Sequence, residues 1–524
     1  MNKVGYDFIK VNVHSANKAN KTVSVPVAGY NILMPGNNPQ ISLYKYFPTS
    51  NSQLARLAML IQSKYPDSTM VDIGANVGDT IAVIRSQSNI PIIAIEGDSF
   101  SYSFLKKNIE QFKDIEILKQ LPTFGPILKK ASIVKSVETV YPSMTYTAHA
   151  SIVSGTYPNK HGIITNEVFT PLVNNAPWYE LRSQNKAQIL PELAQENGYS
   201  AFINSWPTLV GANVDYVVQR AGIHYPKEEQ ESEIRKNSND VLTQEMWDYC
   251  AEAWTLPNYY STDKFSAKAT EYVINKYQPD VMLMHMTLPD HYRHSHGVLS
   301  EKLVDAYKYL DDMLAIVVNA LKANDLYEKT TFVFCSDHGQ VDVDMNINAN
   351  KLLIENGLLT VDENGKMTDW EAYIQSSAVS AQVYLKNPKD EEMVQKVYQL
   401  LNENRDLLHI EHIFTREEVN KTYRLNGEFT FVLEAKEGAA FGWNLLADYQ
   451  NPIMNDDYRV SRGTHGHIPS KGEQPCLILS GPGVLEGKEI SVAKVVDIAP
   501  TCAAILGFEM PEADGRVLRE LLVD

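Results

Sequence analysis

The chain has 524 residues, a formal net charge of −17, and 44% hydrophobic and 21% charged residues. Its length predicts two or more domains, and its composition is that of an ordinary globular protein. The acidic balance argues against nonspecific binding to nucleic acid or to an anionic membrane surface, because both carry negative charge.

The cysteines and the apolar runs set an expectation for the location. The four cysteines are widely spaced and form no Cys-x-x-Cys pair, so no disulfide framework is expected. The N-terminal residues lack the apolar core of a signal peptide, and no apolar run is long enough to span a membrane. We therefore expect a cytoplasmic, reduced protein.

The first region alternates strands and helices. Residues 69–84 predict a strand, a glycine turn and a helix, and a second strand is predicted at 90–96 before a helix near 99–112. Such alternation is typical of a parallel sheet with helices on its faces. The sequence thus predicts a partial Rossmann-like βαβ region over 1–118.

The glycine turn in this region carries a specific motif. Residues 71–79, with the sequence VDIGANVGD, resemble motif I of Rossmann-like S-adenosylmethionine methyltransferases, specifically the FkbM-like group. The resemblance implies that Gly74 and Gly78 let the backbone approach the cofactor, and that Glu96 binds its ribose hydroxyls. It stops near residue 118, so the alternative is a truncated remnant in which these glycines only form a tight turn.

From about 119 an α/β pattern begins again and continues to 524. Residues 170–275 are rich in Trp, Tyr and Asn and indicate a cap insertion, and a second insertion is expected at about 352–450. A long amphipathic helix is predicted at 300–323. Strands of this region are predicted at 280–286, 330–335 and 475–480.

Residues 141–163 form the most specific block of the chain. With their Pro-Ser-Met-Thr-Tyr start, they resemble the nucleophile segment of type I phosphodiesterases and nucleotide pyrophosphatases, within the alkaline phosphatase superfamily. The resemblance implies that Thr145 is the nucleophile and that Asn166 donates to the transferred phosphoryl oxygen. It also implies an alkaline-phosphatase-like parallel-sheet sandwich with cap insertions.

Carboxylates and imidazoles follow three of the apolar runs. Mixed ligands of this kind bind Zn²⁺ or a similar divalent ion, and two adjacent ions can clamp the attacking and leaving oxygens of a phosphoryl group. The resemblance implies that three ligands hold one ion. It implies that a pair of ligands holds the other ion, to which Thr145 also binds. The first set is Asp290, His294 and His465, and the pair is Asp337 and His338.

One expected ligand is missing. In the resembled family the first strand ends in an Asp that binds the second metal, but here methyltransferase-like sequence lies in front of the junction near 118–121. One hypothesis is that Glu96, or failing that Asp98, supplies the carboxylate. The alternative is a broken second metal site.

These observations predict metal-dependent hydrolysis of phosphodiester or pyrophosphate bonds through a phospho-threonine intermediate. Two divalent ions, zinc or manganese, and a small phosphorylated substrate are expected. The alternatives are an S-adenosylmethionine-dependent methyltransferase and a catalytically impaired fusion. The substrate itself is left open, because specificity is expected to lie in the insertions.

Overall fold

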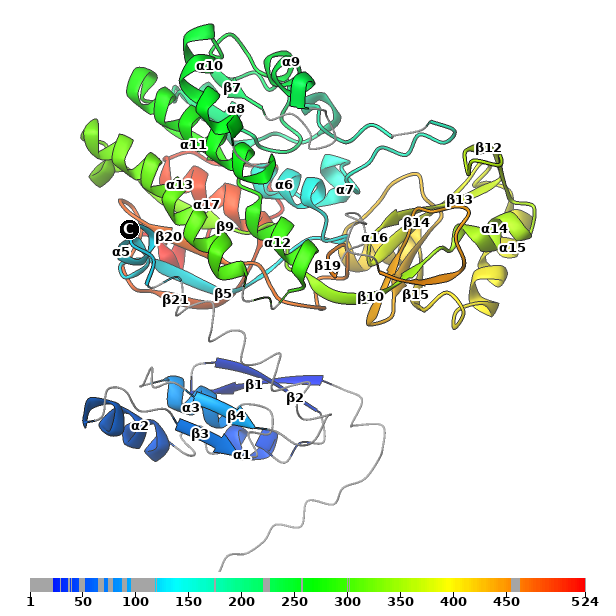
Figure 1. Cartoon of the computed structure of the whole chain (residues 1–524), viewed down its shortest axis with the longest axis horizontal. Coiled ribbons are helices and arrows are strands. Elements are labelled where there is room, and N and C mark those ends of the chain that lie inside the picture. Colours follow the sequence, from blue (N-terminus) through cyan, green and yellow to red (C-terminus); the bar gives the residue numbers. More distant parts are fainter. Residues whose placement is uncertain are drawn as a thin grey trace, which may run out of the picture. The chain divides into compact units, whose positions relative to one another are not determined.

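The computed structural model divides into two compact units, Met1–Gln120 and Leu121–Asp524, and each is described by itself. Figure 1 shows the elements of both units. The residues that the structure describes are 22–28, 30–35, 38, 40–46, 52–64, 70–73, 79–86, 92–95, 118, 120–173, 176–219, 227–255, 258–298, 300, 302–453 and 462–523.

The first unit contains the predicted βαβ arrangement. Strands β3 (Met70–Ile73) and β4 (Ile92–Ile95) pair in parallel, and helix α3 (Asp79–Arg85) lies between them in the chain. Asp79 of the glycine motif is buried, and its carboxylate accepts a hydrogen bond of 2.9 Å from Tyr44. The last residue of the glycine motif is therefore held by a hydrogen bond within this unit. Gly74, Gly78 and Glu96 lie outside the described residues.

An antiparallel hairpin precedes the βαβ arrangement and was not predicted from the sequence. It joins β1 (Thr22–Val27) to β2 (Tyr30–Pro35). Val27, Ile32 and Met34 are fully buried in the core of this unit. Two helices complete the described part, α1 (Gln40–Tyr46) and α2 (Ser52–Lys64).

The second unit has a four-stranded sheet in the order β21-β5-β20-β9. Strand β21 runs parallel to β5, whereas β20 runs antiparallel to both β5 and β9. The predicted α/β class is confirmed, but this sheet is mixed and not entirely parallel. Its strands are β5 (Ser132–Glu138), β9 (Phe332–Cys335), β20 (Leu477–Ser480) and β21 (Glu489–Lys494).

The second unit also has a three-stranded parallel sheet, in the order β7-β6-β8, which with the four-stranded sheet forms its first lobe. Strand β6 comes from the segment predicted as the first cap insertion, and it pairs with β8. Its residues Ala201 and Ile203 join the same buried cluster as Val134 of β5, so part of this segment builds the core. The strands are β6 (Ala201–Asn204), β7 (Tyr216–Val218) and β8 (Val281–Met284).

Helices pack around these sheets. Helix α6 contacts α8 and α17, and α11 lies along α13 (Figure 1). The chain runs from β8 through α12 and α13 to β9, and both strands are edges of their sheets among the described residues. These helices are α6 (Thr145–Ser154), α8 (Leu190–Glu196), α11 (Asn258–Tyr277), α12 (Leu288–His296), α13 (Leu303–Ala323) and α17 (Ile498–Ile505).

The segment predicted as the second insertion forms a lobe with its own core. Its sheet is antiparallel in the order β13-β14-β16-β15, and Ile374, Val383 and Leu433 pack inside it. Figure 1 shows this lobe beside the β5 sheet. Its elements are β13 (Ala372–Ser377), β14 (Ser380–Leu385), β15 (Ile410–Thr415), β16 (Phe431–Ala435), α14 (Asn350–Glu355), α15 (Glu391–Glu403) and α16 (Arg416–Tyr423).

Strand β10 (Val341–Ile347) continues the chain from the β9 loop into this second lobe. It pairs with β17, β18 and β19. The remaining elements are β11 (Leu359–Val361), β12 (Met367–Trp370), β17 (Gly438–Phe441), β18 (Gln450–Pro452), β19 (Gly463–Thr464), α5 (Phe124–Leu128), α7 (Pro158–His161), α9 (Lys227–Asn237) and α10 (Gln244–Cys250).

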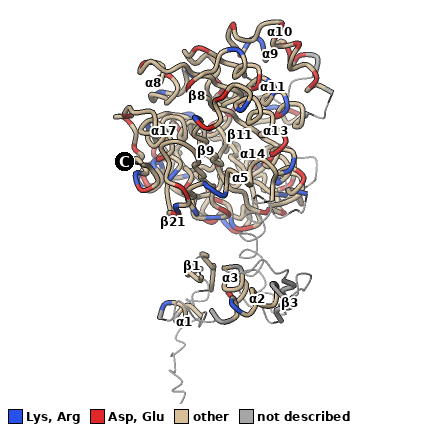
Figure 2. The backbone as a smooth tube through the Cα atoms, turned by 90° about the vertical axis from the view of Figure 1, so that its left-hand side faces the viewer, with Lys and Arg blue, Asp and Glu red and all other residues tan. Residues whose placement is uncertain are grey.

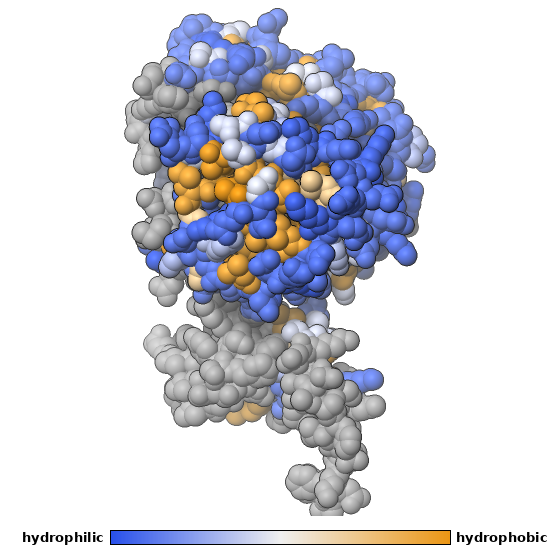
Figure 3. Space-filling view, turned by 90° about the vertical axis from the view of Figure 1, so that its right-hand side faces the viewer, coloured by the Kyte–Doolittle hydropathy of each residue, from blue (hydrophilic) through white to orange (hydrophobic). Residues whose placement is uncertain are grey.

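The surface of the second unit is of mixed character. Basic and acidic positions are interspersed along its backbone in Figure 2. Figure 3 shows apolar side chains lying between hydrophilic ones on one face of this unit. None of the helices in the described ranges is long and apolar enough to cross a membrane.

His161, at the end of α7, is a buried group whose protonation should oppose folding. It is fully buried, its Nδ1 accepts from the Ile163 N–H at 3.0 Å, and its Nε2 lies 2.8 Å from the Ser151 hydroxyl. Burial lowers the pKa of His161 from 6.5 to about 3. The unfolded chain therefore binds more protons below pH 6.5, so this contribution to stability is lost as the pH falls toward 3.

We predict that His161→Gln weakens this pH dependence. Between pH 6.5 and 5 the wild type should lose about 2 kcal/mol of unfolding free energy relative to the variant. Urea unfolding followed by tryptophan fluorescence measures the difference, because all six tryptophans lie in the second unit. His412→Gln, at an exposed position, is the matched control. Parallel pH profiles for wild type and His161→Gln would contradict the prediction.

Candidate metal and nucleophile site

Thr145 is the first residue of α6, which begins after Met144 in extended conformation. The Thr145 hydroxyl lies 3.2 Å from Nε2 of His338. Partial positive charge at a helix N-terminus favours negative charge nearby. The position therefore suits a hydroxyl that reacts with an anionic group.

Asn166 is held beside the same helix start. Its side-chain oxygen accepts a hydrogen bond of 3.0 Å from the backbone N–H of Tyr146, the residue after Thr145. This contact orients the amide and leaves its NH₂ group as the donating end. Asn166 and Thr145, predicted as partners, are thus brought together.

Asp337 and His338 lie in the loop that follows β9. The Thr139 hydroxyl donates to the Asp337 carbonyl at 2.6 Å and anchors this loop to the end of β5. A carboxylate oxygen of Asp337 lies 3.1 Å from His338 Nε2 and 3.4 Å from His149 Nδ1. Burial alone would raise the pKa of Asp337, but the His338 and His149 imidazoles hold it well below its usual range.

Asp290 and His294 project from α12, four residues apart and hence on one helix face. Buried Asp263 accepts hydrogen bonds from the Thr287 and Leu288 N–H groups, at 2.9 and 3.0 Å, and so fixes the start of this helix. His294 Nε2 lies 3.5 Å from an Asp290 carboxylate oxygen. The side chain of Gln340 donates to the same carboxylate.

His465 lies in a segment that is bound closely to the chain in front of Thr145. Its Nδ1 lies 3.0 Å from the Ser143 carbonyl, and the Gly466 N–H donates to the Ser143 carbonyl and hydroxyl at 3.0 and 2.9 Å. Gly466 has φ +87°, and a Cβ there would lie 1.8 Å from the Ser377 carbonyl oxygen. Glycine is required at this position for both reasons.

Three histidines are oriented by main-chain carbonyls. Nδ1 of His294, His338 and His465 lies 2.7, 3.1 and 3.0 Å from the carbonyls of Gly463, Gly339 and Ser143. A carbonyl only accepts hydrogen bonds, so Nδ1 carries a proton and Nε2 is the nitrogen that can face a metal ion. Burial, with the nearby His338 and His294, lowers the pKa of His465 well below its usual value and keeps it neutral.

One group of donors lies close enough to share a metal ion. Ligand atoms of Asp290, His338 and His465 all lie within 4.8 Å of one another. Imidazole and carboxylate donors in this number suit Zn²⁺ or a similar ion. The group takes Asp290 and His465 from one predicted set and His338 from the other, so the structure places the two sets side by side.

Three contacts around these residues escaped the sequence analysis. His149 was not among the predicted site residues, but it pairs with Asp337, and its four-residue spacing from Thr145 on α6 was the available signal. Neither Gln340 at Asp290 nor Asp263 at the start of α12 left a signal, because each acts across a long sequence separation. Glu96 and Asp98 lie outside the described residues, so the carboxylate hypothesis stays a prediction.

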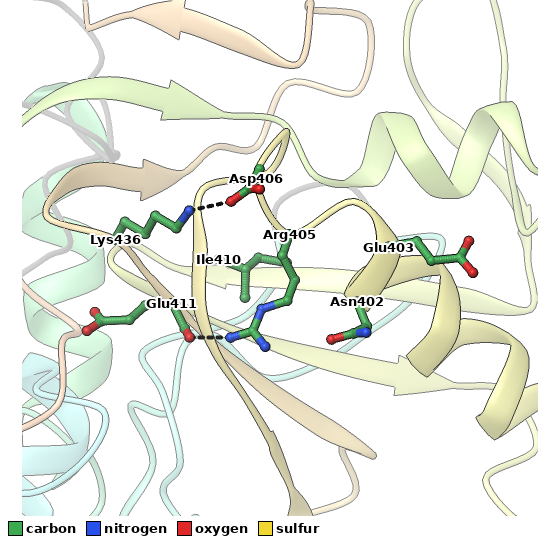
Figure 4. Close-up of a pocket in the computed structure, with 7 residues that line it drawn as sticks. All are labelled: Asn402, Glu403, Arg405, Asp406, Ile410, Glu411 and Lys436. Atoms are coloured by element: carbon green, nitrogen blue, oxygen red, sulfur yellow. Dashed lines mark hydrogen bonds and ion pairs between the residues drawn. The ribbon is translucent and has the colours of Figure 1, made fainter.

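A hollow of about 470 Å³ in the second lobe contains none of the predicted site residues. Figure 4 shows Lys436 paired with Asp406, at 2.7 Å, and Arg405 donating to the backbone carbonyl of Glu411. The Lys436 charge is thus paired with Asp406, and Arg405 is held by the main chain. The lining residues are Asn402, Glu403, Arg405, Asp406, Ile410, Glu411 and Lys436.

Comparison with known families gives a match over residues 104–466 to the family described as type I phosphodiesterase / nucleotide pyrophosphatase. Among individual relatives, the rat ectonucleotide pyrophosphatase/phosphodiesterase family member 1 is 26% identical over 42% of this chain and 21% of its own length. The human family member 5 is 21% identical over 85% of this chain and 80% of its own length. The chain therefore spans about a fifth of the first relative.

Solved structures confirm the fold of the larger unit. The human family member 5 has a TM-score of 0.55 at 19% identity and covers 78% of this chain and 96% of its own. A murine family member 5, an inactive threonine-to-alanine variant in complex with AMP, has a TM-score of 0.54 at 18% identity, with the same shares covered. The alkaline-phosphatase-like class predicted from the motifs is thus confirmed.

We predict that His465→Ala weakens zinc binding by at least about tenfold, because it removes one of three converging donors. Calorimetric titration of the metal-stripped chain with Zn²⁺ measures the affinity. His412→Ala removes an exposed imidazole of β15 and should bind zinc as the wild type does. Equal affinities for all three proteins would exclude His465 as a ligand.

Proposed function

The chain belongs to the type I phosphodiesterase / nucleotide pyrophosphatase family, and on this premise we propose that it hydrolyses phosphodiester or pyrophosphate bonds in small phosphorylated substrates. The observation that carries the proposal is the Thr145 hydroxyl at the start of α6, 3.2 Å from His338 Nε2, with Asn166 held beside it. A nucleophile, an oriented amide donor and an imidazole then converge on one place.

Each residue has a distinct task in this proposal. Thr145 Oγ1 attacks phosphorus and forms a phospho-threonine while the leaving oxygen departs. The Asn166 NH₂ donates to a phosphoryl oxygen whose charge grows in the transition state. Water then attacks the same phosphorus and releases Thr145 with the second product.

The metal ligands divide into two groups in this proposal. Asp290, His294 and His465 would hold one ion, and Asp337 and His338 would hold the other beside Thr145. Two such ions would supply positive charge at the attacking and leaving oxygens. The ring contacts support close spacing of the two groups. The His465 ring stacks on the His338 ring with the centroids 3.9 Å apart, and the centroids of the His465 and His294 rings are 5.1 Å apart.

Nucleotide esters are the substrate class that we propose. The support comes from the murine relative. Its structure is that of an inactive threonine-to-alanine variant in complex with AMP. A threonine nucleophile is consistent with that description. Zinc as the ion, the Glu96 carboxylate and a cytoplasmic location stay predictions.

We predict that Thr145→Ala abolishes hydrolysis of bis-p-nitrophenyl phosphate, with a fall in kcat of at least about 10³-fold, because the nucleophilic oxygen is lost. Thr145→Ser keeps a hydroxyl at the same atom and is the matched control, which should retain measurable turnover. Release of p-nitrophenolate measures both, and chelator should stop the wild type until zinc is restored.

The covalent step has its own readout. Acid-quenched wild-type enzyme, digested and analysed by mass spectrometry, should carry a phosphoryl group on Thr145 during turnover. Undiminished hydrolysis by Thr145→Ala would overturn the proposed mechanism. Loss of turnover in that variant with no phospho-threonine in the wild type would instead favour direct attack by water.

A further inference from the structure

A buried carboxylate outside the proposed site connects to both of its central segments. Glu434, in β16 of the second lobe, has no exposed surface. One of its carboxylate oxygens accepts from the Ile468 N–H at 3.2 Å and lies 2.9 Å from the Lys471 ammonium. The other accepts from the Tyr141 hydroxyl at 3.0 Å.

The partners of Glu434 lie next to the reacting groups in the chain. Tyr141, which is fully buried, precedes Thr145 by four residues, and Ile468 follows His465 by three. These two segments also contact each other directly, through Ser143 and Gly466. The carboxylate thus binds both segments a few residues from that contact.

Lys471 extends the connection into the second lobe. Its ammonium contacts the Glu411 carboxylate and donates to the Ala435 carbonyl at 2.8 Å. In Figure 4 the Glu411 side chain points away from Arg405, whose partner is the Glu411 backbone carbonyl. Two elements of the second-lobe sheet, β15 and β16, therefore hold the segment that follows His465.

Stability alone does not account for this arrangement. Burial raises the pKa of Glu434 to about 7, against the opposing effect of Lys471 and the hydrogen bonds. A buried ion pair is often replaced by apolar side chains of similar volume with no loss of stability. What apolar side chains cannot do is accept hydrogen bonds from Tyr141 and Ile468 at the same time.

The geometry points to Glu434 as a positioning residue that fixes the separation of Thr145 and His465 by accepting from Tyr141 and Ile468 at once. The inference rests on the proposed function for its effect on turnover. The partners of Glu434 are Tyr141, Ile468 and Lys471, so it acts on Thr145 and His465 through the chain beside them. Its removal should displace the His465 segment relative to α6 and so lower kcat and metal affinity more than KM.

The test uses the full chain with three variants. Glu434→Leu with Lys471→Met removes both buried charges and leaves apolar side chains of similar size. Glu434→Gln keeps one accepting oxygen and a polar contact to Tyr141. Asp311→Asn is the matched control, because Asp311 is a buried carboxylate that accepts from the Thr123 and Phe124 N–H groups at 3.0 and 2.7 Å.

We predict that the double variant, which leaves the Tyr141 hydroxyl and the Ile468 N–H without this acceptor, lowers the melting temperature no more than Asp311→Asn does, but loses about 10- to 100-fold in kcat and in zinc affinity. Glu434→Gln should fall between it and the wild type. Asp311→Asn should lower the melting temperature and leave both kcat and zinc affinity unchanged. Hydrolysis of bis-p-nitrophenyl phosphate, calorimetric zinc titration and thermal unfolding are the three measurements.

The outcomes separate the inference from the proposed function. A wild type that binds zinc but does not hydrolyse the diester refutes the function, while weaker zinc binding by the double variant still supports positioning. A stable double variant with wild-type kcat and zinc affinity overturns the positioning role and leaves the function standing. In a third outcome, both variants of Glu434 lose activity only in proportion to their lost stability, and Asp311→Asn does the same. The role of Glu434 is then structural and the inference is wrong.

Discussion

The contact between Ser143 and the His465–Gly466 segment is the constraint on which the site depends. Two pieces of chain separated by 322 residues meet there through main-chain atoms, in a hydrogen bond between the Gly466 N–H and the Ser143 carbonyl. Main-chain contacts cannot be adjusted by side-chain rotation, so this one limits how far the Thr145 and His465 segments can separate, and Glu434 behind it holds the same two segments. The absence of a Cβ at Gly466 lets the segment approach this closely, against the Ser377 carbonyl.

The remaining site residues are oriented by the backbone in the same way. Carbonyl groups fix the protonated nitrogen of three histidines, and the Asp263 carboxylate fixes the first turn of α12 beneath Asp290. The side chains are thus oriented before any ligand binds, which lowers the entropy cost of binding one. The second lobe takes part in this orientation, because Ser377 and Glu434 both belong to its sheet.

Local patterns allowed the sequence to predict some of these features. Apolar runs placed Asp337 after a strand, and the family resemblance grouped Asp290 with His294, which lie four residues apart on α12. Strand direction is not encoded in such patterns, which is why the antiparallel course of β20 was missed. Partners such as Asp263 and Gln340 could not be predicted either, since nothing near them in the sequence marks which distant group they bind.

Two carboxylates, half-buried Asp337 and buried Glu434, show how the fold divides its charge between chemistry and architecture. Imidazoles surround Asp337 and lower its pKa, so it remains an anion that can face a cation. Glu434 has a single ammonium and neutral donors around it, and burial raises its pKa. An anion beside His338 suits a metal site, whereas a carboxyl group behind the Ser143 contact needs only to accept hydrogen bonds. The difference in surroundings therefore separates a candidate ligand from a residue that orients the chain around it.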